Sequence, residues 1–213
     1  MTTQTENKLV YFLGNTMYIN VTNLCSNRCV FCIRGVSDTV AGTNLWLDGE
    51  NVTAEQIIEQ LDKNEPQKRD EIVFCGYGEP LIKIDIIKTV ASHIKEKYPN
   101  VPVRVNTNGH ANLIHKRNVV SELIGLIDRV SISLNGENAD KYDEISQCKF
   151  DKNIAYEEVK NFISECAKNG IATTATVVSG YKHYNVDLSA CKEIAESLGA
   201  KFKIREWLEE GYQ

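Results

Sequence analysis

Residues 72–80 read IVFCGYGEP, and this stretch, with the segment that follows it, indicates the fold. The run from Ile72 to Cys75 is rich in β-branched and apolar residues and ends at a glycine, as a buried strand does. Further along, apolar residues recur at helical spacing on one face: Ile84, Ile87, Val90, Ala91 and Ile94. A strand followed at once by an amphipathic helix is one βα unit.

The same unit recurs on both sides of this stretch. Further strand-like runs are Tyr18 to Val21, Val103 to Asn106, Val130 to Leu134, Ala172 to Val178 and Lys201 to Arg205. Helical patterns separate them: one begins at a Thr53–Gln56 capping box, a weaker one covers 113–127, and apolar stripes run over 156–166 and 188–198. Such alternation gives parallel strands with right-handed helical crossovers.

The chain length limits how many units can form. Six units fit 213 residues, whereas a closed eight-unit barrel usually needs about 250. We therefore expect an α/β fold, a partial (βα)6 barrel with parallel strands and outer helices. We expect a single domain over 1–213, with its core at about 17–206 and no accessory domain.

Composition and charge exclude several classes of protein. The net charge of −5, from 24 basic and 29 acidic residues, argues against a protein that binds duplex DNA. The apolar runs fall short of the roughly 20 residues that cross a membrane, and the N-terminus lacks the pattern of a secretory signal. Three of the seven cysteines lie within eight residues, unlike a secreted disulfide scaffold. These features predict a cytoplasmic protein.

The clustered cysteines form a C-x3-C-x2-C loop at Cys25, Cys29 and Cys32, inside an unusually long connection over 23–52. Three thiolates at this spacing can wrap one small inorganic centre. A structural zinc site needs four ligands, and no second C-x2-C or H-x3-H completes one here. A cubane iron–sulfur cluster held by three cysteines instead leaves one iron open for another ligand.

This loop resembles that of the radical S-adenosylmethionine (SAM) superfamily. The resemblance implies that Cys25, Cys29 and Cys32 hold a [4Fe–4S] cluster whose fourth iron is chelated by the amino and carboxylate groups of SAM. The family usually has an aromatic residue just before the last cysteine, near the adenine, and Phe31 matches it.

Three further segments resemble SAM-binding motifs of the family. Residues 76–80 (GYGEP) resemble the glycine–glutamate motif that binds the SAM amino group, 106–109 (NTNG) resemble its TNG, and 131–135 (SISLN) resemble the segment that reaches the SAM carboxylate or ribose. Alone, the first fits a turn at least as well, the second fits an Asn-Gly turn better, and the third equally fits a polar strand face. Together they end predicted parallel strands, where barrel active sites gather. The expected cofactor contacts are Phe31, Gly76, Tyr77, Gly78, Glu79, Thr107, Ser133 and Asn135.

The resemblance also implies an activity and partners. Such an enzyme cleaves SAM reductively to a 5′-deoxyadenosyl radical, which abstracts hydrogen from a substrate, here an unidentified small molecule, peptide or nucleotide. Flavodoxin or ferredoxin would donate the electron, and Arg28 and Arg34 could form a positive collar for it. Residues 11–35 and 44–50 (NLWLDGE) further resemble small radical SAM proteins associated with TatD-type metal-dependent hydrolases, which predicts association with such a hydrolase.

Other functions remain open at this point. A purine enzyme resembling the 7-carboxy-7-deazaguanine synthases is one alternative. A zinc-binding nucleic-acid module and an iron–sulfur sensor without turnover are others, although neither explains the motifs at the strand ends.

Three residues are weak catalytic candidates. Cys148 follows the fourth predicted strand and could supply a hydrogen atom to a substrate radical. His110 and His183 lie in loops expected at the active-site rim, where each could contact substrate or move protons. An exposed loop histidine or thiol without a role is the simpler interpretation of each. Arg205 is expected to be a surface charge.

Overall fold

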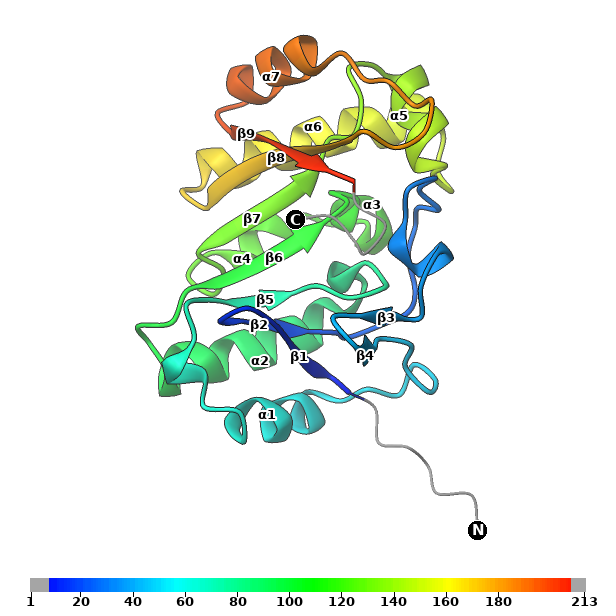
Figure 1. Ribbon diagram of the computed structural model, residues 1–213. Coiled ribbons are helices and arrows are strands. Elements are labelled where there is room, and N and C mark those ends of the chain that lie inside the picture. The colour runs from blue at the N-terminus through cyan, green and yellow to red at the C-terminus, as the bar shows by residue number, and fades with distance from the viewer. Residues whose placement is uncertain (1–7, 208–213) are drawn as a thin grey trace.

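The computed structural model describes residues 8–207, and its centre is a seven-stranded sheet in the order β1-β2-β5-β6-β7-β8-β9 (Figure 1). The strands are β1 (Val10–Leu13), β2 (Thr16–Ile19), β5 (Ile72–Phe74), β6 (Val103–Thr107), β7 (Arg129–Ser133), β8 (Ala172–Ser179) and β9 (Lys201–Glu206). From β2 to β9 all neighbours are parallel, which confirms the six predicted strands.

Two hairpins were not predicted. β1 pairs with β2 in antiparallel fashion through a turn at Gly14, whose φ of +58° suits glycine. Within the long connection, β3 (Thr39–Val40) pairs with β4 (Thr43–Asn44). Strands of two to four residues are too short for alternation to stand out from the surrounding sequence.

Helices connect the parallel strands. They are α1 (Ala54–Asp62), α2 (Ile84–Lys97), α3 (Ala111–His115), α4 (Val120–Leu123), α5 (Ala139–Ser146), α6 (Lys152–Lys168) and α7 (Leu188–Ser197), with 3-10 turns η1 (Ile33–Gly35), η2 (Pro66–Lys68) and η3 (Pro80–Lys83). The weak pattern over 113–127 is two short helices, because Lys116 adopts a left-handed conformation with φ +54° and ends the first. The sequence did not predict α5.

The predicted capping box is present at the start of α1. The Thr53 hydroxyl accepts from the Gln56 backbone at 3.3 Å, and the Gln56 side chain accepts from the Thr53 backbone at 3.0 Å. We expect Thr53→Ala to lower the free energy of unfolding by about 1 kcal/mol, measured by urea denaturation. Thr89→Ala, at an exposed position within α2, is the control. Equal losses in both variants would contradict a capping role.

The two faces of the sheet differ in chemistry. On one face, apolar side chains such as Val103 and Val105 are fully buried against the helices and form the core. Arg104 and Asn106 alternate with them and are only half-buried on the opposite face, which we call the inner face. The parallel strands end on the side of the sheet where residues 20–45 lie, at the right of Figure 1, whereas β1 runs the other way. The helices within 8–207 are too short or too polar to cross a bilayer.

Candidate active site at the carboxyl ends of the strands

The cysteine loop follows β2 and holds three free, half-buried thiols, Cys25, Cys29 and Cys32. The pKa of Cys25 is raised to about 11, mainly by burial and next by the charge of Glu79. The pKa of Cys29 is raised to about 12, again by burial first and then by the two other thiols. The three sulfurs therefore lie within electrostatic reach of one another, and a bound metal centre would drive off their protons.

This donor set fits a cluster better than a single ion. Within residues 8–207, no three His, Cys, Asp or Glu side chains gather closely enough to hold one metal ion. A cubane cluster distributes its thiolate ligands over different irons, so its ligands need not converge on one point. Three free thiols in one loop suit such a centre.

Arg34 fixes the cysteine loop from within. Its guanidinium donates to the carbonyl oxygens of Asn23 and Tyr77, each at 3.2 Å, and of Asn27 at 3.3 Å. The donors of Arg34 thus serve the loop backbone and leave its charge in place, and the positive collar of Arg28 and Arg34 stays a prediction. Arg28 is exposed, with Nε 3.4 Å from Gln147 Oε1.

A buried hydrogen-bond network lies beneath the loop. Asn108 Nδ2 donates to Ser26 Oγ at 2.8 Å, and Ser26 Oγ lies 3.2 Å from His110 Nδ1. Tyr142 OH lies 3.1 Å from His110 Nε2 and accepts from Asn27 Nδ2 at 3.2 Å. When the Ser26 hydroxyl donates to His110 Nδ1, the ring proton lies on Nε2 and is donated to Tyr142 OH. The hydrogen bonds then all run in one direction, from Asn108 through Ser26 and His110 to Tyr142. Ser26 and Asn27, the two residues after Cys25, are thus held by side chains far away in sequence.

Of the three catalytic candidates, His110 and Cys148 lie together and His183 lies apart. His110 is fully buried, and its Nδ1 lies 3.7 Å from Cys148 Sγ, so two candidates meet below the cysteine loop. The interpretation of His110 as an exposed loop histidine is wrong, because α5 and the cysteine loop cover it. His183 is exposed and stacks on Tyr184 with ring centroids 4.3 Å apart.

Burial lowers the pKa of His110 to about 4. Between that value and the ordinary 6.5, the unfolded chain binds a proton that the folded chain does not, so stability is lost as the pH falls from 6.5 to 4. We expect the difference in unfolding free energy between wild type and His110→Gln to shrink by about 3 kcal/mol over this range. The measurement is urea denaturation at several pH values. The pH dependence of His183→Gln should match that of the wild type. A difference between wild type and His110→Gln that stays constant over this pH range would contradict the assignment.

Glu79 joins the glycine motif to the TNG-like turn. Its carboxylate accepts from Thr107 Oγ1 at 2.8 Å, Asn108 N at 2.6 Å and Leu81 N at 3.0 Å, and only 3% of the residue is exposed. Burial raises the pKa of Glu79 to about 7, although these bonds favour the charged form. A nearby cation would favour the ionised carboxylate.

Gly76 and Gly78 let the cysteine loop approach. A Cβ at Gly76 would collide with the Asn20 side chain, and one at Gly78 would collide with the carbonyl oxygens of Thr22 and Leu24. The Glu79 backbone also donates to Leu24 O at 2.7 Å. Glycine is therefore required at both positions by the close packing of these two segments.

Thr107 and Asn135, two of the other predicted contacts, are buried. The Thr107 hydroxyl is engaged by Glu79 and by the backbone of Gly109, so it acts through its neighbours. Asn135 has a left-handed backbone, φ +58°, and its Nδ2 donates to Ser146 Oγ at 3.1 Å. Its Oδ1 is buried without a hydrogen-bond partner in the described part of the chain, which leaves an acceptor for a ligand donor.

The remaining predicted contacts lie around the same rim. Ser133 is half-buried on the inner face at the end of β7. Phe31 is buried in an apolar cluster with Val178 and Tyr181. Tyr77 is buried and its hydroxyl donates to the Ser37 carbonyl at 2.6 Å, so it holds the long connection.

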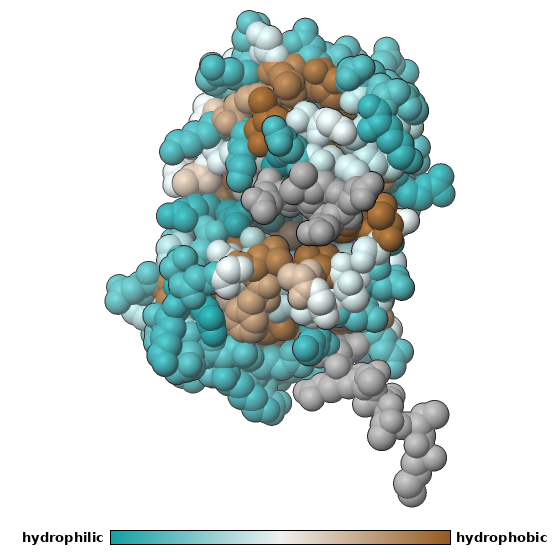
Figure 2. All heavy atoms as spheres, viewed as in Figure 1, coloured by the Kyte–Doolittle hydropathy of each residue, from teal (hydrophilic) through white to brown (hydrophobic). Residues whose placement is uncertain are grey.

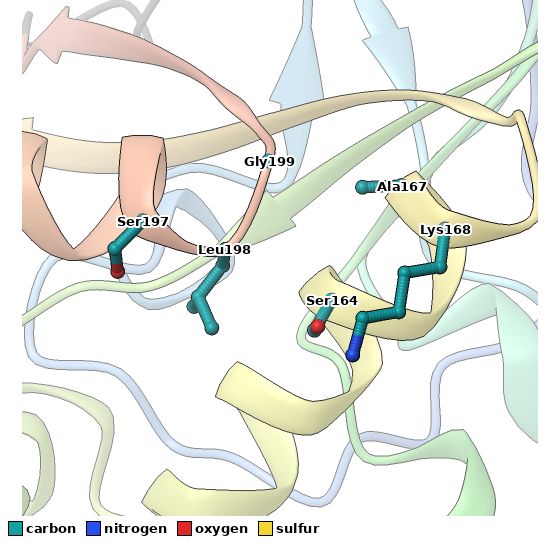
Figure 3. A pocket seen from close by; sticks show the side chains of 6 residues that line it. All are labelled: Ser164, Ala167, Lys168, Ser197, Leu198 and Gly199. Atoms are coloured by element: carbon teal, nitrogen blue, oxygen red, sulfur yellow. The ribbon is translucent and has the colours of Figure 1, made fainter.

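A hollow elsewhere on the surface is separate from this rim (Figure 3). It lies where α6 and α7 end, and it is lined by Ser164, Ala167, Lys168, Ser197, Leu198 and Gly199. Because these helices end near the amino ends of β8 and β9, the hollow is remote from the cysteine loop. Figure 2 shows a mainly hydrophilic surface with apolar residues in two areas, one near the top, where Figure 1 places α7, and one in the lower half, where it places β1, β3 and β4.

Sequence reasoning missed several residues of the site. Asn108 was quoted within NTNG but not assigned a contact, yet its amide binds Ser26 and lies 3.8 Å from Cys25 Sγ. Tyr142 and Ser146 were also missed, because they belong to α5. The only available signal was the position of Asn108 at a strand end.

Comparisons with known proteins agree with this geometry. A family model described as the Radical SAM superfamily matches residues 19–197. The chain is 25% identical over 181 residues to a probable dual-specificity RNA methyltransferase RlmN of Thermotoga petrophila, covering 82% of this chain and 48% of that protein. It is 30% identical over 141 residues to a probable GTP 3′,8-cyclase of Methanocella arvoryzae, covering 65% and 40%. The chain thus spans about half the length, or less, of these curated relatives.

The solved structure of Streptococcus suis SuiB bound to precursor peptide SuiA is similar in fold. The TM-score is 0.67 at 15% sequence identity, and the match covers 90% of this chain and 39% of SuiB. At that identity the likeness supports the partial barrel and says nothing of substrate.

Proposed function

Because this chain belongs to the radical SAM superfamily, whose members use a [4Fe–4S] cluster and SAM, we propose that it cleaves SAM reductively and takes a hydrogen atom from a substrate. When bound, the cluster and SAM supply this one-electron chemistry. The observation that carries the proposal is the meeting, at one rim, of three free thiols, the buried Glu79 carboxylate and the Asn135 amide oxygen without a partner.

Each part of the rim has a proposed task. Cys25, Cys29 and Cys32 would hold the cluster, with Arg34 and the His110 network keeping their loop in place. Glu79 would balance the ammonium of SAM, since a carboxylate has capacity beyond its three present donors.

The remaining contacts of the cofactor follow from the same rim. Gly76, Tyr77 and Gly78 would present backbone groups near the ammonium, and Thr107 would orient Glu79. Ser133 would bind the carboxylate or ribose of SAM, and Asn135 Oδ1, an acceptor, would receive a ribose hydroxyl. Phe31 would lie near the adenine.

The proposal also includes partners. Leu24 and Val36 flank the cysteine loop in sequence and are 48% and 55% exposed, and Arg28 adds positive charge beside them. Such a surface suits an acidic electron donor such as flavodoxin or ferredoxin.

Seven free thiols suit a reducing compartment, the cytoplasm. Association with a TatD-type hydrolase rests on the resemblance of 11–35 and 44–50. Of the substrates left open, a nucleotide is favoured by the RNA and GTP in the names of two relatives.

The test is anaerobic. The protein is reconstituted with iron and sulfide, reduced with dithionite and given SAM, and 5′-deoxyadenosine is measured by mass spectrometry. The triple variant Cys25/Cys29/Cys32→Ala is the control. Product that requires the three cysteines supports the proposal. No product from a fully loaded cluster, together with no SAM binding, would overturn it in favour of a cluster-containing sensor.

A further inference from the structure

Asn108 connects the two halves of the proposed cofactor site. It is buried, with 7% of the residue exposed, and it directly follows Thr107 at the carboxyl end of β6. Its backbone N–H donates to Glu79 Oε2 at 2.6 Å, on the side proposed for SAM. Its side-chain Nδ2 donates toward Cys25 Sγ at 3.8 Å, on the side proposed for the cluster. One residue therefore contacts both the carboxylate for the SAM ammonium and a cysteine ligand.

The neighbouring hydrogen bonds fix which way the Asn108 amide points. Its Oδ1 accepts from the His110 backbone N–H at 3.1 Å, so the NH2 group faces the cysteine loop. Exchanging the oxygen and nitrogen would set two N–H donors against each other. Nδ2 gives one hydrogen to Ser26 Oγ at 2.8 Å. An amide nitrogen carries two hydrogens, so the second is left for Cys25 Sγ.

Cys25 Sγ accepts from two N–H groups that belong to different parts of the chain. The Asn27 backbone N–H donates to it at 3.4 Å from within the same loop. The Asn108 donor lies 83 residues away in sequence, so it depends on the packing of the loop against β6. When Cys25 is a thiolate ligand, both bonds become charge-assisted and therefore stronger.

Hydrogen bonds to a cluster ligand act on the redox equilibrium of the cluster. A [4Fe–4S] cluster that takes one electron from its donor gains one negative charge, which it shares with its sulfur ligands. An N–H dipole directed at such a sulfur stabilises the reduced form more than the oxidised form. Hydrogen bonds to the sulfurs are accordingly among the features that set the reduction potentials of these clusters.

We propose that Asn108 is a positioning residue that holds Cys25 and, through its N–H···S hydrogen bond, raises the reduction potential of the cluster. The inference rests on the proposed function, because it requires the cluster. It adds to that function a residue that controls how readily the cluster accepts the electron from its donor.

The test measures the midpoint potential of the cluster and not turnover. Protein reconstituted with iron and sulfide is titrated anaerobically with dithionite and redox mediators, without SAM, and the reduced cluster is followed by electron paramagnetic resonance. At a fixed potential, we expect Asn108→Ala to lower the ratio of reduced to oxidised cluster by about threefold to tenfold. For one electron this is a fall in midpoint potential of about 28 to 59 mV.

Asn108→Asp is the second variant. It keeps the shape of the side chain and an oxygen for the His110 backbone N–H, but it has no N–H to donate to Cys25. Its ionised carboxylate also adds negative charge beside the sulfur. The midpoint potential should therefore fall at least as far as in Asn108→Ala, and this variant decides the matter where the alanine variant loses its cluster.

Ser26→Ala is the matched control, because Ser26 is buried in the same hydrogen-bond network. It removes the hydroxyl between Asn108 and His110 but leaves the Asn108 amide able to donate to Cys25. Urea denaturation should show that both Ser26→Ala and Asn108→Ala lose stability, whereas Ser26→Ala should keep the midpoint potential of the wild type. An unchanged potential in both Asn108 variants, an equal shift in Ser26→Ala, or loss of the cluster from both Asn108 variants would overturn the inference.

The proposed function is judged separately, by SAM binding and cleavage in the wild type. A wild type that cleaves SAM while the Asn108 variants keep its midpoint potential defeats this inference alone. A lowered potential in the Asn108 variants of a protein that neither binds nor cleaves SAM defeats the proposed function alone.

Discussion

Cys29→Ala is expected to lose most of the iron that the wild type binds on reconstitution, about four atoms per chain, and to form 5′-deoxyadenosine only at background level. Cys29 is one of three thiols in a single loop, and a cubane with two remaining cysteine ligands has a second open iron exposed to solvent and oxidation. Iron analysis, visible absorption and the SAM cleavage assay measure the effect.

Cys191→Ala is the matched control. That thiol is fully buried on α7, away from the loop, so the variant should keep its cluster while losing some stability from the lost packing. Cleavage that persists in Cys29→Ala, or a cluster lost equally in Cys191→Ala, would contradict the assignment of ligands.

Glu79→Ala is expected to lower the free energy of unfolding by about 3 kcal/mol and to weaken SAM binding by at least about tenfold. The substitution leaves the Thr107 hydroxyl and the Asn108 and Leu81 backbone N–H groups buried without their acceptor. Urea denaturation of the protein without SAM measures the first effect, and calorimetric titration of cluster-loaded protein with SAM measures the second.

Glu79→Gln separates the two effects. Its side-chain oxygen can still accept from Thr107 and Leu81, but its NH2 group then faces the Asn108 N–H, so only part of the stability should return. The negative charge that would balance the SAM ammonium is gone. Tight SAM binding by Glu79→Gln would show that the carboxylate serves only the TNG-like turn.

The pH dependence of Glu79 opposes that of His110. The pKa of Glu79 is about 7 in the folded protein against an ordinary 4.5, so the folded chain keeps a proton that the unfolded chain releases, and stability falls as the pH rises through this range. His110 contributes the reverse slope. The two terms are similar in size, about 3 kcal/mol each. The two effects nearly cancel, so these groups should give the unfolding free energy of the wild type little dependence on pH. A variant that lacks one group should show the pH dependence caused by the other.

The fold was predictable because its strands are buried on the helix-facing side. Runs such as 72–75 and 103–106 are apolar enough to be recognised without any tertiary information. Helix α5 was not predictable, because only two of its eight residues, Tyr142 and Ile145, carry large apolar side chains that face the interior. Eight residues are too few to establish a helical period.

The site was predictable in its motifs but not in its connections. Glu79 could be placed at a strand end from its position in GYGEP, whereas its bonds to Thr107 and Asn108 depend on the pairing of β5 with β6. The burial of His110 depends on Ser26, 84 residues away, and on Tyr142, 32 residues away. Contacts of that sequence separation leave no local pattern to read.

The position of β9 at the margin of the sheet has a consequence for association between molecules. Its inward side pairs with β8, while no strand of the described residues pairs with its other side. The unpaired backbone groups of an edge strand can pair with a strand of another chain. Charged side chains on the edge strand, especially lysine, prevent such pairing. Lys201, Lys203 and Arg205 alternate along β9 in that manner. These charges thus protect the protein against aggregation through the sheet margin.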